Sequence, residues 1–246
     1  MKIQSDRGKS SKAGVEHGQR RKAVVEELLA DIFQGRLKPG EHLVISRLAK
    51  RLDMSPTPIR EALVTLEGIG IVDIAPNCGA VVRRVTENDV REVCQVRRAL
   101  ECAAVRLACG RIDLAELQEL AEACRGQIDN QPSTAKTAAA DDGRAVHCAI
   151  QSARNLDSRL HDLIANSCGN RFLSKELGRL KLLFRTFRDV AWDRRSTEDL
   201  PRFAEEAREH LAIVEALLTG DAKAASRAMA RHIRSGLKYW SRGLPK

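Results

Sequence analysis

Residues 43 to 85 constrain the fold of this chain more than any other segment. The pattern there predicts two short helices joined by a tight turn, followed by two strands joined by a second turn. The first helix carries apolar residues at the spacing of one face of a 3.6-residue repeat: Ile45, Leu48, Ala49 and Leu52. Residues 53–55, Asp-Met-Ser, end this helix.

A second helix is expected to begin directly after Ser55, which stands as an N-cap before Pro56. Proline is tolerated in a first helical turn because its missing N–H would have no partner inside the helix. The buried stripe of this helix is Ile59, Ala62, Leu63 and Leu66. Arg60 therefore points away from the core, where it can reach a nucleic-acid groove.

Two β-prone runs follow, residues 71–75 and 80–85, separated by the turn-forming cluster Pro76-Asn77-Cys78-Gly79. Arg83 and Arg84 make the second run basic. A helix, a turn, an exposed arginine on a second helix and a basic hairpin together are typical of a winged helix-turn-helix, which binds DNA. The alternative, a small α+β fragment without a ligand, does not account for these features occurring together.

The rest of the chain predicts a mainly α protein in three parts. Residues 1–18 lack apolar periodicity and indicate a disordered basic tail. Residues 19–85 complete the winged helix-turn-helix, an α+β domain that starts with an amphipathic helix. Residues 86–246 read as helix throughout and predict an all-α antiparallel bundle.

Composition limits where the protein acts and what it binds. No apolar run approaches the ~20 residues that span a bilayer, and the N-terminus is not a signal peptide. We therefore expect a cytoplasmic protein without a membrane partner.

Its seven cysteines lack metal-binding spacing and are expected to be reduced, mostly buried thiols. The formal net charge of +9 suits a polyanionic partner such as DNA.

Four residues of the helical part have the spacing of a metal site. Asp157 and His161 are four residues apart, so a helix places both on one face. His210 precedes Gly220 by ten residues and His232 follows it by twelve, so an antiparallel hairpin brings them to one level. Three imidazoles and one carboxylate suit zinc, nickel, manganese or iron, and spacing does not choose among these ions. The alternative, histidines at the surface or at an interface, stays equally open on spacing alone.

The N-terminal part resembles the GntR family of bacterial transcription regulators. The resemblance is carried by residues 35–40, 48–49, 55–63, 66–67 and 76–79. It implies that Arg60 contacts a base, that Thr57 contacts a phosphate, and that the turn at Gly79 brings the wing to the minor groove. The family usually has arginine directly after the serine, where this chain has Pro56. The complete predicted DNA-binding set is Ser55, Thr57, Arg60, Arg47, Asn77 and Gly79.

The C-terminal part resembles the FCD effector domain of FadR-type GntR regulators. The resemblance lies in residues 97–101, 156–170, 209–213 and 229–233. Many members of that family hold a divalent metal through one Asp and three His, and a carboxylate metabolite completes the coordination. The positions that match these ligands are Asp157, His161, His210 and His232. On this resemblance zinc is our first choice of metal, with nickel, manganese or iron as alternatives.

Arginines are the candidate partners of the effector anion. Arg97 matches the family's first-helix arginine, although a salt bridge with Glu101 one turn later is an equally good account of it. Arg185 and Arg188 are further candidates, with a solvated helix face as the alternative.

The leading functional hypothesis is a homodimeric, ligand-responsive transcription regulator, expected to be a repressor. It would bind a palindromic double-stranded DNA operator and a small organic or sugar acid, and it is not expected to be an enzyme. Two alternatives share the four ligand candidates: a metal-dependent hydrolase fused to a DNA-binding domain, and a regulator that senses the metal itself.

Overall fold

The computed structural model describes residues 7–75, 79–129, 142–192, 200–242 and 244–245. The chain divides into two compact units, residues 1–85 with 185–190, and residues 86–184 with 191–246. The first unit contains α1 (Arg7–Phe33), β1 (His42–Leu43), α2 (Ile45–Arg51), α3 (Pro56–Ile69), β2 (Val72–Ala75) and β3 (Gly79–Val82). The predicted winged helix-turn-helix and the mainly α fold class are thereby confirmed.

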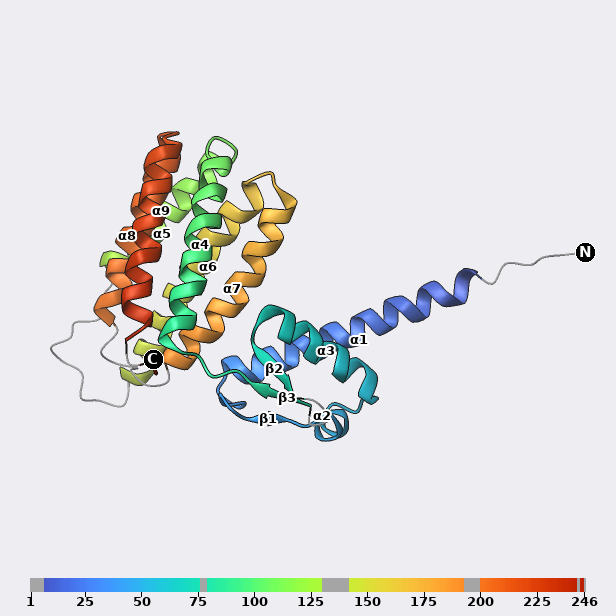
Figure 1. Ribbon diagram of the computed structural model, residues 1–246. Coiled ribbons are helices and arrows are strands. Elements are labelled where there is room, and N and C mark those ends of the chain that lie inside the picture. The colour runs from blue at the N-terminus through green and yellow to red at the C-terminus, as the bar shows by residue number, and fades with distance from the viewer. Residues whose placement is uncertain (1–6, 76–78, 130–141, 193–199, 243, 246) are drawn as a thin grey trace, which may run out of the picture. The chain divides into compact units, whose positions relative to one another are not determined.

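The wing is a small antiparallel sheet with the strand order β1-β3-β2 (Figure 1). β2 and β3 are the predicted hairpin, and β1 is a third strand that the sequence pattern did not reveal. α3 packs against α1 and also contacts α2 and β2. Its predicted apolar stripe is buried, including Ile59, Ala62 and Leu66. The opposite face of α3 is thereby left at the surface.

The N-terminal helix is longer than the sequence predicted. We expected a disordered tail through residue 18, but α1 is continuous from Arg7 to Phe33. The segment lacks an apolar stripe, yet it contains good helix formers such as lysine, arginine, glutamate and alanine. Because extending an existing helix costs far less than nucleating one, the packed turns around Val24 and Leu28 can propagate toward the N-terminus.

The second unit is a helical bundle, and residues 185–190 of its α7 are counted with the first unit. Its helices are α4 (Glu87–Ala108), α5 (Leu114–Asp129), α6 (Asp142–Ser167), α7 (Arg171–Trp192), α8 (Leu200–Leu218) and α9 (Ala222–Trp240). α4 lies along α9, and α8 packs against α5, α6 and α9 (Figure 1). Local signals set the helix starts: Thr86 and Asp89 form a capping box on α4, and the Asp221 side chain caps α9. No helix among the described residues is long and apolar enough to cross a membrane.

Three of the cysteines are buried in the helical unit, as expected for thiols that fill the core. They are Cys94, Cys124 and Cys168, whereas Cys148 is exposed and Cys78 lies outside the described residues. Burial raises the pKa of Cys94 and of Cys124 to about 11. Both thiols are therefore protonated at neutral pH, which makes them poor nucleophiles.

Gly79 is the position in the wing where a side chain is least tolerable. Its φ is +93°, and a Cβ built there would overlap the carbonyl oxygen of Leu43 on β1. We predict that Gly79→Ala destabilises the wing by at least about 1–3 kcal/mol, seen as faster amide hydrogen exchange in β2 and β3.

Gly68→Ala is the matched control, because Gly68 is helical and nothing lies within 4 Å of its added Cβ. It should stabilise α3 by about 0.5–1 kcal/mol. Equal exchange rates in the two variants would contradict the role given to Gly79.

Candidate functional site

Most of the predicted DNA-binding residues lie at the surface of the winged unit. Arg47, Ser55, Thr57 and Arg60 are all exposed. Ser55 occupies the N-cap position of α3, but its side chain makes no capping hydrogen bond. Gly79 begins β3, and Asn77 lies outside the described residues.

An open groove of about 870 Å³ runs between α2, α3 and the wing. Arg60 and Gly79 both line it, together with Pro56 and Val64. Val64 follows Arg60 by one turn and is 56% exposed. The second helix and the wing thus share one accessible surface, the arrangement that a winged helix-turn-helix presents to DNA.

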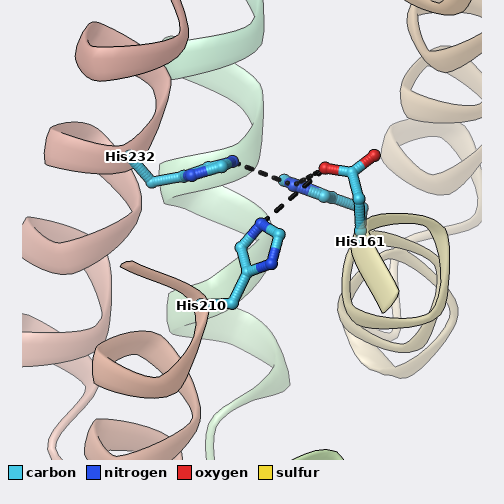
Figure 2. Close-up of side chains that lie close together, drawn as sticks. His161, His210 and His232 are labelled. Atoms are coloured by element: carbon cyan, nitrogen blue, oxygen red, sulfur yellow. Dashed lines mark hydrogen bonds and ion pairs between the residues drawn. The ribbon is translucent and has the colours of Figure 1, made fainter. Parts of the chain in front are cut away.

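The structure brings the four predicted metal ligands together in the helical unit. Figure 2 shows His161, His210 and His232 pointing toward one another from α6, α8 and α9. One nitrogen or oxygen atom from each of these residues and from Asp157 falls within 4.8 Å of the others. The rings of His210 and His232 have centroids 4.6 Å apart, which confirms that the hairpin around Gly220 places them at one level.

Two imidazole nitrogens face each other at the middle of this cluster. The Nε2 atoms of His161 and His232 are 3.3 Å apart, and Asp157 Oδ1 lies 3.5 Å from His161 Nε2 and 3.7 Å from His210 Nε2. Two nitrogens on one tetrahedral zinc lie about 3.3 Å apart, given zinc–nitrogen bonds of about 2.0–2.1 Å. The spacing of the donor atoms therefore suits a single ion.

Carboxylates from outside the cluster hold the far nitrogens of two of these rings. Glu101 Oε2 lies 2.5 Å from His161 Nδ1, and Glu209 Oε2 lies 2.9 Å from His232 Nδ1. A carboxylate at Nδ1 favours the tautomer that carries its proton there, which leaves the Nε2 lone pair directed inward. Histidines that ligate metals in proteins usually have such a partner.

Sequence reasoning missed both of these carboxylates as site residues. Glu209 directly precedes His210, and Glu101 was considered only as a partner of Arg97. The sequence did contain one signal for Glu209, because this residue stands directly before the predicted metal ligand His210. Which imidazole it contacts is decided by how α8 and α9 pack, and spacing along the chain does not report that.

His210 differs from the other two histidines. It is almost fully buried, and its Nε2 finds no hydrogen-bond partner among the described residues. Burial and the charge of His232 hold the pKa of His210 well below its ordinary value, so the ring is neutral. An unpaired, buried lone pair aimed at a cluster of donors is costly unless a cation shares it.

Arginines accompany the two carboxylates that contact the histidines, Arg97 at Glu101 and Arg202 at Glu209. Burial raises the pKa of Glu101, but the charges of Arg97 and His161 outweigh it and hold that pKa well below its ordinary value. Burial likewise opposes ionisation of Glu209, and hydrogen bonds from His232 and Arg202 nevertheless lower its pKa to about 2. For His161, burial lowers the pKa, yet Glu101 raises it above the ordinary value overall. Both outer carboxylates are therefore ionised at neutral pH.

The three predicted effector arginines have different surroundings. Arg97 is buried, binds Glu101 Oε1 through Nε at 2.6 Å and lies 4.0 Å over the Phe184 ring. The salt bridge considered as its alternative role is thus present. Arg185 is exposed on α7, and the side chain of Arg188 lies outside the described part of that helix.

Comparison with known proteins gives two domain matches in the order that the sequence suggested. Residues 20–82 match the bacterial regulatory proteins of the gntR family, and residues 92–235 match the FCD domain. The HTH-type transcriptional regulator McbR of Escherichia coli (strain K12) is 40% identical over 102 residues, which cover 40% of this chain and 46% of McbR.

Two further similarities extend over most of the chain. A probable D-xylose utilization operon transcriptional repressor of Paenarthrobacter nicotinovorans is 28% identical over 214 residues, covering 87% of this chain and 85% of that protein. The solved structure of E. coli McbR/YncC has the same fold, with a TM-score of 0.66 and 23% identity over 90% of this chain and 96% of that one.

The FCD match alone covers more than half of the chain. It follows an N-terminal gntR-type DNA-binding domain, and the relatives are transcription regulators. These findings identify a regulator and not an enzyme, which removes the hydrolase alternative. The chain belongs to the GntR family of bacterial transcription regulators, in the subgroup that carries a C-terminal FCD domain.

Proposed function

We propose that this regulator is a homodimeric repressor whose operator affinity depends on a small organic or sugar acid bound beside a divalent metal ion. The ion would be held by the four clustered side chains, Asp157, His161, His210 and His232. Zinc is our first choice, and nickel, manganese or iron would accept the same donors. Repression is inferred from the relative that is named as a probable operon repressor.

The observation that carries this proposal is the convergence of three imidazoles, two of them buried and that of His161 half-buried, on one point. Glu209 Oε2 lies 2.9 Å from Nδ1 of His232, and Glu101 Oε2 lies 2.5 Å from Nδ1 of His161. With a proton on each Nδ1 of neutral rings, the two Nε2 lone pairs would face each other across 3.3 Å. Two lone pairs at that distance repel unless a proton or a metal ion lies between them, and we propose that the metal ion takes this place. The unpaired Nε2 of His210 requires the same partner.

A carboxylate effector fits the chemistry of such a centre. When bound, the ion would supply a Lewis-acidic position for a carboxylate oxygen beyond its protein ligands. Burial opposes the charge of Arg97, but the Glu101 carboxylate raises the pKa of its guanidinium, with a smaller contribution from Asp157. We propose that Arg97 also donates hydrogen bonds to the effector carboxylate. Arg185 is left out of this proposal, because its guanidinium lies 4.2 Å over the ring of Phe33 in the first unit.

The output of the protein is binding to DNA. A homodimer would present two copies of α3 to a palindromic operator, with Arg60 reading a base and Thr57, Ser55, Arg47, Asn77 and Gly79 fixing the backbone register. An effector changes operator affinity only if it binds the DNA-competent and incompetent states with different affinity. The metal-sensor alternative uses the same ligands, but in it the metal alone would change operator affinity.

The metal ligands give the first prediction. Protein stripped of metal should take up one Zn²⁺ per chain, and its helical unit should gain about 2.7 kcal/mol at a free concentration one hundred times Kd. Asp157→Asn should remove most of this gain, because it deletes the anionic donor while keeping the side-chain shape.

Asp162→Asn is the control on the same helix, since Asp162 is half exposed and pairs with Lys181 instead. Metal uptake should be measured by atomic emission and stabilisation by thermal unfolding. Equal gains in the two variants would refute the assigned ligand set.

Pro56 gives a prediction for the DNA-binding surface. It is exposed in the first turn of α3 and lines the groove that Arg60 also lines. Pro56→Arg should tighten binding and add about one phosphate contact per chain, which steepens the slope of log K against log salt by about 0.9 per chain.

The test is a salt titration with the tightest duplex selected from a random library. Gln151→Arg, on an exposed position of the helical unit, adds the same charge elsewhere and should leave the slope unchanged. An unchanged slope for Pro56→Arg as well would show that residue 56 does not face the DNA backbone.

A thermal-shift screen of carboxylic and sugar acids separates the effector from the metal. We expect one class of acid to stabilise the zinc-loaded protein and to change its affinity for the selected duplex. Neither effect should remain after a chelator has removed the zinc. A change in DNA affinity with Zn²⁺ alone, and none with any acid, would instead establish the metal-sensor alternative.

A further inference from the structure

We infer that Arg202 is a positioning residue of the proposed metal centre, which acts on His232 through Glu209. The inference rests on the proposed function, because it assigns an outer residue to the same centre. Arg202 lies near the start of α8, two turns before Glu209 and His210. Its side chain is only 4% exposed, although it carries a permanent charge.

The contacts of Arg202 fix both oxygens of the Glu209 carboxylate. Its Nη1 lies 3.0 Å from Oε1, and its Nη2 lies 3.1 Å from Oε2. Glu209 Oε2 also accepts from His232 Nδ1 at 2.9 Å. A forked, two-bond contact of this kind prevents the carboxylate from rotating, so its oxygen stays in line with the imidazole.

A further contact joins Arg202 to the helix that carries His232. Its Nη1 lies 3.0 Å from Ser235 Oγ, one turn after His232 on α9. The same nitrogen is 3.0 Å from Glu205, whose side chain is 62% exposed. Arg202 thus contacts both the Glu209 carboxylate on α8 and Ser235 in the next turn of α9. These contacts restrain the orientation of the His232 ring, and with it the direction of Nε2.

The same three-residue arrangement occurs a second time, on other helices. Arg97 and Glu101 of α4 form an ion pair at 2.6 Å, and Glu101 contacts His161 Nδ1 on α6. In both cases an arginine holds a glutamate, and the glutamate holds the outer nitrogen of an imidazole whose Nε2 faces inward. Two independent copies converging on one pair of Nε2 atoms indicate a role in shaping the centre.

Charge gives a second reason for the arginine. A buried carboxylate beside a ligand histidine adds negative charge to the site unless a cation compensates it. Arg202 supplies that cation for Glu209, so Glu209 can accept a hydrogen bond without becoming a competing anionic ligand. Without Arg202 the carboxylate would be free to rotate away from His232 Nδ1.

The test compares metal affinity in full-length variants. Arg202→Met keeps the length of the side chain and removes its charge and donors, and Glu209→Gln removes the carboxylate. Co²⁺ affinity is measured by competition with a chromophoric chelator, and the visible spectrum of the bound Co²⁺ reports its ligand geometry. We expect each variant to bind Co²⁺ about 10–100-fold more weakly than wild type, with an altered spectrum.

Because Arg202 acts through Glu209, the double variant should bind Co²⁺ no more weakly than Glu209→Gln alone. Val214→Ala is the control for general loss of stability, since Val214 is fully buried on α8 and is not part of the cluster. It should lower the unfolding temperature and leave the affinity and the spectrum of the folded protein unchanged.

Arg202→Lys is a second variant in case Arg202→Met does not fold. It keeps the positive charge but cannot form the two-bond contact with the Glu209 carboxylate. It should fold, and its Co²⁺ affinity should lie between those of wild type and Glu209→Gln. Nitrogen-15 NMR of the His232 ring in the zinc-loaded wild-type protein should show the proton on Nδ1. In Arg202→Lys the Nδ1–H···O contact should be weaker or lost.

Two results would overturn the inference, and they are distinguishable. Wild-type affinity and spectrum in folded Arg202→Met or Arg202→Lys would remove the role of Arg202 while leaving the metal centre in place. Failure of the wild-type protein itself to bind Co²⁺ or Zn²⁺ would remove the metal centre, and the role of Arg202 with it.

Discussion

The contact between a buried carboxylate and the outer nitrogen of an imidazole is the constraint on which the helical unit depends. It occurs at Glu101 with His161 and at Glu209 with His232. A carboxylate at Nδ1 favours a proton on that nitrogen, so that a neutral ring directs the lone pair of Nε2 into the centre. The apolar packing of the bundle could tolerate either tautomer, whereas cation binding requires only one of them.

The packing of the helices brings the carboxylates and the imidazoles of these contacts together. α4 packs along α9 and α6, and α8 packs along α9 and α6, so the helices that carry ligands and the helices that carry outer carboxylates are neighbours. Gly220, in the left-handed region at φ +72°, reverses the chain, and the Asp221 cap starts α9 at once. This short connection brings His210 and His232 together. The cost of burying Glu101 and partly burying Glu209 is offset because an arginine contacts each carboxylate.

Much of this arrangement could be predicted from the sequence, because it depends on local periodicity. The face of α3, the hairpin of the wing, the Asp157–His161 pair and the level of His210 and His232 all follow from repeats of 3.6 or 2 residues and from one turn. β1 could not be predicted, since a two-residue strand has no pattern and exists only through pairing with β3. Helix at residues 7–18 was missed because propagation from a packed helix needs no apolar stripe.

The outer residues were beyond sequence reasoning for a different reason. Glutamate and arginine at positions 101, 202 and 209 look like solvated helix residues, and only the packing of α4, α8 and α9 turns them inward. Side-chain roles at the centre of a bundle depend on which helix faces which, and that information is not local in the chain.

The most direct test of the account is metal-edge anomalous diffraction from crystals of the zinc-loaded protein. We predict one anomalous peak per chain, coordinated by Nε2 of His161, His210 and His232 and by the Asp157 carboxylate. Glu101 and Glu209 should still contact Nδ1 of His161 and of His232. Zinc found elsewhere, or a direct His161–His232 hydrogen bond that persists at saturating zinc, would contradict it.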